Sequence, residues 1–484
     1  MPDLETGFAL LAIVLIVSAL ASGVVLRAPL SFPMIFLGVG VLLGPRGAGV
    51  IEISLDDPVL EAVAIITLSL ALFIDAVQLR LDELREGWQV PVLTTGPGTL
   101  LMMALIALVA MLVLDEPFTR ALLIGAALSS LDPVVVRDIA RDTRIPGSVR
   151  RALSIEAGTD DIIVLPTILI LIAVARGSTE GIGDWAVFLL ELFLLGPIAG
   201  LAVGGVGSWL IGQVDRRIPI PREYQALFGI GLVFAAYVLG EAVGGSGFLA
   251  AFLAGFAVVL FNNQLCDCFV EYGETTGEMA MLLAYILLGA VLSDEIGLAP
   301  IGAAVLFAVL VLAVARPLAM ITVLRRATIS RVARLFIAFF GPLGLSSLLL
   351  VLVMLHNGVP EADRLFAIVG VVVVISVVVH GMSATPLGAW YGRRLARVTL
   401  AEERESTAAG LLRGEAVQMS RISVDELARR LAEPNPPLVL DVRTRSQYAL
   451  DPNRIPGSVR VPPDQVAEWA AAQDRARAIV AYCT

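Results

Sequence analysis

The sequence contains no lysine, so all 34 of its basic residues are arginine. Charge of either sign is scarce: 16% of the 484 residues are charged, whereas 57% are hydrophobic. Soluble globular chains carry more charge and fewer long apolar runs, so this composition excludes the soluble classes and indicates a polytopic membrane protein. Basic clusters interleaved with aromatic residues are also missing, and we therefore expect no nucleic-acid partner.

Cysteine is almost as scarce, with three residues in the chain. Cys266 and Cys268 lack a second pair of ligands, so we expect two ordinary thiols rather than a metal site, and no cofactor. The N-terminus is acidic, with Asp3 and Glu5, and has neither a basic region nor a small-residue cleavage site. We therefore expect the first apolar run to be retained rather than cleaved.

The apolar runs predict thirteen membrane-spanning helices, and hence an all-α polytopic fold. The expected spans are residues 7–27, 31–44, 59–76, 95–114, 119–139, 153–175, 185–212, 224–241, 246–262, 277–293, 299–324, 335–355 and 365–390. Placing the N-terminus outside puts eighteen arginines in inner loops and four in outer loops. The positive-inside rule therefore places the C-terminus in the cytoplasm and predicts a multi-pass protein of the cell membrane.

The sixth span begins with three carboxylates: Glu156, Asp160 and Asp161. A charge at the bilayer centre costs about 2.5–3.5 kcal/mol, so three in one span indicate a functional site. On a helix Glu156 and Asp160 share a face, whereas Asp161 points about 100° away. The adjacent aspartates therefore face different neighbours, and two acids this close titrate as a coupled set.

Two spans carry helix-breaking residues in mid-membrane: Asp132-Pro133 in the fifth and Gly341-Pro342 in the twelfth. They are seven spans apart, so they cross in opposite directions, as in an inverted repeat with a site between discontinuous helices. Asp132 is either a helix cap in a kinked packing helix or part of this site, and its neighbourhood favours the site. Ser129 and Ser130 precede it and offer hydroxyl ligands.

Other polar residues in the spans receive simpler interpretations. Arg316 needs a buried carboxylate as its partner. Asp75, at the end of the third span, is expected to be a solvated end residue. His380 is either a pH sensor or, more commonly, a packed and hydrogen-bonded histidine. The small residues of 245–255 are expected to serve close helix packing rather than ligand binding.

Residues 1–397 form the expected membrane domain, 398–421 a polar linker, and 422–484 a small α/β tail. The tail pattern predicts a helix at Val424–Ala432 and a strand at Leu438–Arg443. A turn and strand are expected at Ile455–Pro462, then a helix at Asp464–Gln473 and a last strand ending at Cys483.

Residues 1 to about 395 resemble the monovalent cation/proton antiporters, in particular the thirteen-helix bacterial sodium/proton exchangers. The resemblance rests on Asp132-Pro133, on Glu156 four residues before Asp160-Asp161, on Ser-Gly-Phe-Leu-Ala-Ala-Phe-Leu-Ala-Gly (246–255), on Ala315-Arg316-Pro317, on Phe-Gly-Pro-Leu-Gly-Leu-Ser-Ser (340–347), and on His380-Gly381. It implies a homodimer, elevator-like alternating access, Asp161 as the cation- and proton-carrying carboxylate, and Glu156 as the partner of Arg316.

Three positions depart from that family's pattern. Relatives of this branch usually have Asn-Asp at 160–161, and a paired Asp-Asp is typical of the electrogenic branch, whose members often use a membrane lysine. The family usually has Thr before Asp132-Pro133, where this chain has Leu131. Leu343 stands where many relatives have arginine, which leaves Arg316 as the sole basic residue well inside a span.

The expected function is therefore exchange of a monovalent cation, Na⁺ first and Li⁺ second, for H⁺ at Asp160 and Asp161, with Asp132, Ser129 and Ser130 nearby. The alternative is a K⁺/H⁺ exchanger or a regulated K⁺ efflux system. The stoichiometry stays open, because the Asp-Asp pair favours two protons per cation and the absent lysine does not.

Residues 422–484 resemble a rhodanese-like domain through Asp441-Val442-Arg443, Ile455-Pro456-Gly457-Ser458 and a strand ending at Cys483. Only Thr484 follows Cys483, so the anion-binding loop expected after the cysteine is missing from the sequence. We interpret the tail as truncated or degenerate and expect no sulfurtransferase activity, which makes a membrane-tethered sulfurtransferase or sulfide sensor the third hypothesis.

Overall fold

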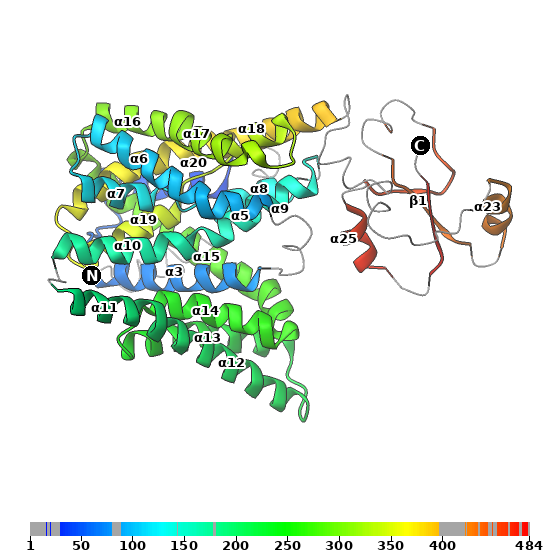
Figure 1. The fold of residues 1–484 in the computed structure, drawn as a ribbon, viewed down its shortest axis with the longest axis horizontal. Helices are drawn as coiled ribbons and strands as arrows, with labels where there is room; N and C mark the ends of the chain where they lie inside the picture. Colours follow the sequence, from blue (N-terminus) through cyan, green and yellow to red (C-terminus); the bar gives the residue numbers. More distant parts are fainter. Residues whose placement is uncertain are drawn as a thin grey trace.

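The computed structural model of the chain describes residues 16, 20, 30–79, 89–142, 144–177, 181–395, 422, 424–433, 436–443, 448, 453–462, 465–473 and 477–482. The predicted first span and the 398–421 linker lie outside these residues, apart from positions 16 and 20. The other twelve predicted spans are all helical, which confirms the all-α architecture of the membrane domain (Figure 1).

Six of these spans form the first half of the bundle. They consist of α2 (Phe32–Leu43), α3 (Pro58–Val77), α5 (Gln89–Leu93) continued by the π-turn η1 (Thr94–Gly98) and α6 (Thr99–Val113), α7 (Phe118–Ala127) with α8 (Pro133–Ala140), α9 (Gly147–Thr159) with α10 (Asp161–Arg176), and α11 (Ile182–Leu190) continued by η2 (Glu191–Leu195) and α12 (Gly196–Asp215).

The second half continues in the same manner. It consists of α13 (Arg222–Ala242), α14 (Gly247–Phe261), α15 (Asn263–Glu295), α16 (Ile301–Leu310) continued by η4 (Val311–Ala315) and α17 (Arg316–Val323), α18 (Arg331–Phe339) with α19 (Leu345–His356), and α20 (Ala362–Leu395). Short 3-10 turns, η3 (Ile296–Leu298) and η5 (Leu324–Arg326), follow α15 and α17.

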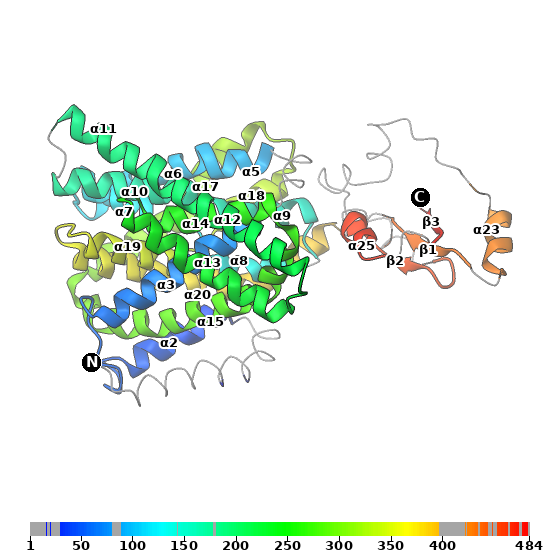
Figure 2. The same cartoon turned by 90° about the horizontal axis from the view of Figure 1, so that it is seen from below.

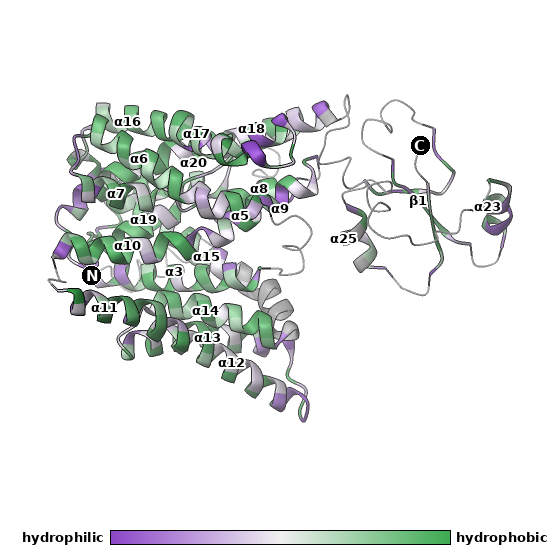
Figure 3. Ribbon diagram, in the orientation of Figure 1, coloured by the Kyte–Doolittle hydropathy of each residue, from purple (hydrophilic) through white to green (hydrophobic). Residues whose placement is uncertain are grey.

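Among the described residues, eight helices are long and apolar enough to cross a bilayer. Four shorter apolar helices accompany them: α2, α7, α14 and α19. Two of the short ones, α7 and α19, are halves of the spans that the sequence predicts to be broken. Apolar residues cover the sides of the helices, while polar residues gather at their ends and in the tail (Figure 3).

The helices form two packed groups. In one, α12 packs on α14, α14 on α3, and α15 on α2 and α3. Helices α12 and α14 lie on the lower side in Figure 1 and at the front in Figure 2. In the other, α6, α7 and α10 pack with α16–α20. Gly200 lies against the backbone of Ala250, and Gly255 against the backbone of Phe73. These contacts confirm that the small residues of 245–255 serve close packing.

Three spans contain a π-turn with a proline in it or just after it: Pro97 lies inside η1, and Pro197 and Pro317 are the second residues after η2 and η4. Proline has no N–H to donate and clashes with the preceding turn, so a widened turn accommodates it. The first of these π-turns lies at the start of the fourth predicted span. The third delivers Arg316, the residue after η4, into the protein interior.

The tail is a small α/β unit. It contains α23 (Val424–Leu431), β1 (Leu438–Asp441), β2 (Val459–Arg460), α25 (Val466–Ala471) and β3 (Ile479–Tyr482). The strands are parallel in the order β2-β1-β3. These elements match the predicted ones within a few residues. Burial raises the pKa of Asp441, but hydrogen bonds from Arg443, at 2.6–3.2 Å, outweigh it and hold that pKa below its ordinary value.

Candidate functional site

The fifth span is broken where the sequence predicts. α7 ends at Ala127, and the chain then runs to Asp132, whose backbone is extended and which caps α8. Pro133 is the first residue of α8, where its missing N–H costs nothing. The break therefore deprives backbone groups of residues 128–131 of the hydrogen bonds of a continuous helix, and these groups need other partners inside the membrane domain.

The two broken spans cross at Asp132. Its backbone N–H donates to the carbonyl of Pro342 at 2.8 Å. Its carboxylate accepts from Val134 N–H of α8 at 2.8 Å and from Leu345 N–H of α19 at 3.2 Å. One carboxylate thus caps the N-termini of two half-helices, where the positive ends of both helix dipoles favour a negative charge. The structure places Asp132 as a cap of the crossing, with both oxygens engaged.

Tyr285 is a member of this crossing that the sequence interpretation missed. The Tyr285 hydroxyl of α15 donates to the Asp132 carboxylate and accepts from Leu345 N–H at 3.0 Å. A side chain at Gly344 would collide with both groups, so the close approach requires glycine. The available signal was a hydroxyl-bearing aromatic residue inside an apolar span, because such a hydroxyl needs a partner there.

Asp160 and Asp161 lie together beside this crossing. Asp160 is fully buried, and its Oδ2 accepts from Leu131 N–H at 2.7 Å. Asp161 is 7% exposed and lies beside the Ser130 hydroxyl. Within the described residues, the Oδ1 atoms of both aspartates are buried without a hydrogen-bond partner. Adjacent buried carboxylates with open oxygens are costly unless a cation or a proton joins them.

The two serines of the break differ in role. Ser129 donates back to the Gly125 carbonyl of its own helix at 2.7 Å. Ser130 is fully buried and faces Asp161. No donor in the described part of the chain reaches the carbonyl oxygens of Ser129, Ser130 or Leu131. Ser130 and these carbonyls therefore offer oxygen ligands next to the acid pair.

Asp75 corrects one sequence expectation. It is not a solvated end residue: it is 7% exposed, near the end of α3, and interacts electrostatically with Asp161, Asp132 and Arg137. Gly158, in the acidic segment, approaches the Cβ of Asp75. A carboxylate from α3 thus borders the same site.

Glu156 and Arg316 lie together, as the family resemblance implies. Arg316 Nη1 is 3.0 Å from Glu156 Oε1, and each side chain is only 1% exposed. Arg316 Nη2 also donates to the carbonyls of Phe340 at 3.2 Å and Ile337 at 3.4 Å. The guanidinium therefore closes the C-terminal end of α18, whose unpaired carbonyls carry negative dipole charge. A side chain at Gly341 would occupy the guanidinium position.

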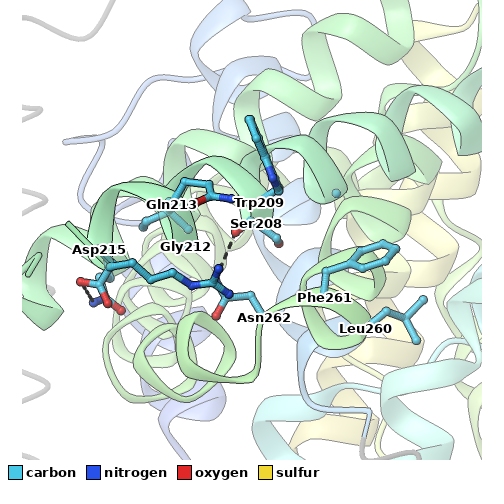
Figure 4. Close-up of a pocket in the computed structure, with 12 residues that line it drawn as sticks. Ser208, Trp209, Gly212, Gln213, Asp215, Leu260, Phe261 and Asn262 are labelled. Atoms are coloured by element: carbon cyan, nitrogen blue, oxygen red, sulfur yellow. Dashed lines mark hydrogen bonds between the residues drawn. The ribbon is translucent and has the colours of Figure 1, made fainter. Parts of the chain in front are cut away.

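The described residues contain no cluster of three His, Cys, Asp or Glu side chains suited to a resident metal ion. A cavity of about 720 Å³ lies elsewhere, at the ends of α12 and α14, and is lined by residues such as Trp209, Asp215, Arg216, Phe261 and Asn262 (Figure 4). It includes none of the carboxylates above. Cys483, the predicted rhodanese-like cysteine, lies outside the described residues.

Comparison with known families supports the sequence resemblance. A family model described as "Sodium/hydrogen exchanger, transmembrane" matches residues 10–390, and one described as "Rhodanese-like domain" matches residues 423–484.

Curated relatives match the membrane domain at low identity. The K⁺/H⁺ antiporter NhaP of Alkalimonas amylolytica is 26% identical over 383 residues, covering 78% of this chain and 66% of the relative. The K⁺/H⁺ antiporter NhaP2 of Shewanella sp. (strain MR-4) is 26% identical over 404 residues, covering 82% and 68%. The chain thus spans about two thirds of the length of these relatives.

Among solved structures, the sodium proton antiporter MjNhaP1 of Methanocaldococcus jannaschii has the same fold, with a TM-score of 0.65 at 19% identity, covering 81% of this chain and all of that one. The family match covers most of the chain, including both breaks, the acid pair and Arg316. The chain therefore belongs to the sodium/hydrogen exchanger family and carries a C-terminal rhodanese-like domain.

Proposed function

We propose that this protein exchanges a monovalent cation for protons across the membrane, with the cation bound at Asp160 and Asp161. One observation carries the proposal: within the described residues, two adjacent buried aspartates each have an unpartnered Oδ1, and the carbonyls of 129–131 in the neighbouring break accept no hydrogen bond. Carboxylate, hydroxyl and carbonyl oxygens replace the hydration shell of a hard monovalent ion.

The proposed ligands are Asp161, Ser130 and the carbonyls of residues 129–131, with Asp160 sharing its charge between the cation and Leu131 N–H. Deprotonated Asp161 binds the cation, and protonated Asp161 releases it. Because proton and cation compete for the same negative charge, each crossing of the loaded site carries one or the other, and the two flows are coupled.

The number of protons per cation follows from the count of carboxylates. Asp160 is a second acid where relatives usually have asparagine, and Asp75 is a third at the same site. Asp132 and Glu156 are committed to the crossing and to Arg316. We propose that Asp160 holds the second proton, so that exchange moves net charge.

Two cations qualify as the substrate. Na⁺ is the first expectation from the family resemblance, and MjNhaP1 is described as a sodium proton antiporter. K⁺ is the second, since the curated relatives that match the whole membrane domain are named K⁺/H⁺ antiporters. The ligand types accommodate both ions, and cavity size decides between them.

The proposed setting is the cell membrane, with the N-terminus outside and the tail in the cytoplasm, as the arginine distribution predicts. A homodimer with elevator-like movement of one helix group against the other is proposed from the family resemblance.

The function is tested in proteoliposomes that contain the purified chain and a pH-sensitive dye. Na⁺, Li⁺, K⁺ and choline are added to vesicles with a pH gradient, with and without a voltage clamp by valinomycin. Alkalinisation with Na⁺ or K⁺ but not with choline supports the proposal, and acceleration under the clamp supports net charge movement. A chain that dissipates no pH gradient with any cation would overturn it.

Asp161→Asn tests the site itself. We expect exchange to fall by about a hundredfold or more, because the charge for which cation and proton compete is gone; this corresponds to about 2.7 kcal/mol. Glu223→Gln, an exposed acid at the start of α13, is the matched control and should stay within about twofold of the parent. Exchange by Asp161→Asn at the parental rate would refute the assignment.

A further inference from the structure

Two buried polar residues of α20 have no role in the site described above. Ser376 and His380 are four residues apart, so they lie on the same face of the helix, and they are 0% and 1% exposed. Polar side chains buried this deeply in a membrane domain are expensive unless hydrogen bonds satisfy them. Their partners show what they do.

Both residues reach the break of the twelfth span. The Ser376 hydroxyl oxygen accepts from Leu343 N–H at 2.8 Å, on the α19 side of the break. His380 Nε2 lies 3.1 Å from the Phe339 carbonyl oxygen, on the α18 side. Ser376 Oγ and His380 Nδ1 are 3.2 Å apart, and Nδ1 also lies 3.0 Å from the Ser376 carbonyl.

These contacts form one continuous chain if the imidazole is neutral. The Ser376 oxygen already accepts from Leu343, so its hydrogen is available for Nδ1, and Nε2–H then donates to Phe339. Neutral imidazole accepts at one ring nitrogen and donates at the other, so it joins an N–H to a C=O on opposite sides of the ring. This series of hydrogen bonds thus replaces those that the missing helical turn would have made.

This hydrogen-bonded chain also fixes the part of the twelfth-span break that contacts Asp132. Leu343 stands between Pro342, whose carbonyl accepts from Asp132 N–H, and Leu345, whose N–H donates to the Asp132 carboxylate. Arg316 serves carbonyls on the α18 side. Among the described side chains, Ser376 and His380 together bond both sides of the gap.

We propose that Ser376 and His380 are positioning residues for the cation site, which hold the two halves of the twelfth span in register so that Pro342 and Leu345 keep Asp132 in place. Asp132 in turn adjoins Leu131, whose N–H donates to Asp160. The inference rests on the proposed exchange function for its effect on transport, and on the hydrogen bonds alone for its effect on the break.

The test uses the full chain in proteoliposomes at one fixed pH, with the cation concentration varied. Ser376→Ala and His380→Leu should each raise the half-saturating cation concentration about tenfold, the effect of one lost buried hydrogen bond. Because the two residues act in one chain, the double variant should stay within about twofold of the weaker-binding single variant. Ser376→Thr and His380→Gln keep the donor and acceptor and should stay within about threefold of the parent.

Ser383→Ala is the matched control, since this hydroxyl on the same helix donates to the His380 carbonyl at 3.3 Å and does not contact the break. Parental half-saturation in both single variants, or effects that multiply in the double variant, would overturn the proposal.

Amide hydrogen exchange separates this inference from the proposed function. In detergent-solubilised Ser376→Ala and His380→Leu, the Leu343 amide should exchange at least about tenfold faster than in the parent, whether or not the protein transports ions. If the parent exchanges no cation for protons, the proposed function fails, and the Leu343 rate alone decides the inference. An unchanged Leu343 rate contradicts it.

Discussion

The two broken spans meet at Asp132, yet protein groups satisfy their backbone carbonyls to different degrees. In the twelfth span, the carbonyls of Phe339, Phe340 and Pro342 receive donors from His380, from Arg316 and from Asp132 N–H. Protein groups thus bond three carbonyls of the twelfth-span break, while those of Gly341, Leu343 and Gly344 receive no donor from the described residues. In the fifth-span break none of the carbonyls of residues 129–131 has such a donor.

This difference supports the proposed position of the cation. An unpaired carbonyl inside a protein costs free energy. The carbonyls of residues 129–131 therefore need another partner, either water or a cation. The open carbonyls lie beside Asp160 and Asp161, whose free Oδ1 atoms need positive charge. Residues 339–344, which form the twelfth-span break, include no carboxylate. The comparison is consistent with the proposal that the fifth-span break contributes ligands and that the twelfth-span break is held mainly by protein groups.

Arg316→Met should have the largest effect, because it removes protein donors from the carbonyls of the twelfth-span break. The variant removes the donor to Phe340 and leaves Glu156 as a buried charge without its partner. We expect a stability loss of about 3–5 kcal/mol, measured as the unfolding midpoint in detergent.

Glu156→Met with Arg316→Met is the control. It removes the stranded charge and should recover most of the loss, but not the part due to the Phe340 carbonyl. A double variant as unstable as Arg316→Met alone would contradict the role of Glu156.

Tyr285→Phe should have the next largest effect, because Tyr285 joins the two breaks through Asp132. The variant removes one donor from a buried carboxylate that keeps its bonds to Val134 and Leu345. A hydrogen bond to a charged group is worth about 1.5–3 kcal/mol, so we expect destabilisation in that range. Tyr237→Phe, on α13, is the matched control. Equal unfolding midpoints for the two variants would contradict the assignment.

Asp160→Asn separates the structural role of this side chain from the role of its charge. The asparagine oxygen still accepts from Leu131 N–H, so the unfolding midpoint should stay close to that of the parent. The variant removes one acid from the proposed site, so we expect the exchange rate to fall about tenfold, which corresponds to about 1.4 kcal/mol. The acceleration of exchange by valinomycin should also shrink. The measurement compares clamped and unclamped rates. Undiminished voltage dependence would show that Asp160 holds no transported proton.

The sequence predicted the parts that depend on local chemistry. Asp132-Pro133 and Gly341-Pro342 predict the two helix breaks, and twelve spans lie where apolar runs predict them. The Glu156–Arg316 contact was expected from the family pattern, since a buried arginine requires an acid.

The missed residues depend on which helices face each other. Asp75 reads as the polar end of an apolar run, and only the approach of Gly158 of α9 to α3 reveals that it is buried at the acid pair. Tyr285 and Ser376 lie on α15 and α20, and no periodicity states that these helices reach the crossing. Hydrogen bonds between residues 33 to 153 positions apart follow from tertiary packing, which local patterns do not encode.

The smallest effect is expected where the start of the fifth span meets the start of α20. Arg120 of α7 contacts Glu361, just before α20, at 2.5 Å, and Glu116 bonds both Arg120 at 2.9 Å and Arg364 at 3.0 Å. Unlike the crossing, this cluster reaches the surface: the Glu361 side chain is 54% exposed. Exposed ion pairs contribute little, because water and salt screen them.

Glu361→Gln tests that contrast through its pH dependence. The hydrogen bond from Arg120, followed by the charges of Arg120 and Arg364, holds the pKa of Glu361 below its ordinary value of 4.5. A carboxylate whose pKa is lower in the folded state stabilises that state above its unfolded pKa and loses this contribution as the pH falls through the folded pKa. The parent should therefore be slightly more stable than the variant at pH 7, and the difference should vanish below the folded pKa. The difference should also shrink at high salt, which screens exposed charges, whereas the Arg316→Met effect in the dry crossing should not. Equal salt dependence of the two variants would show that the surface cluster and the buried crossing are not electrostatically distinct.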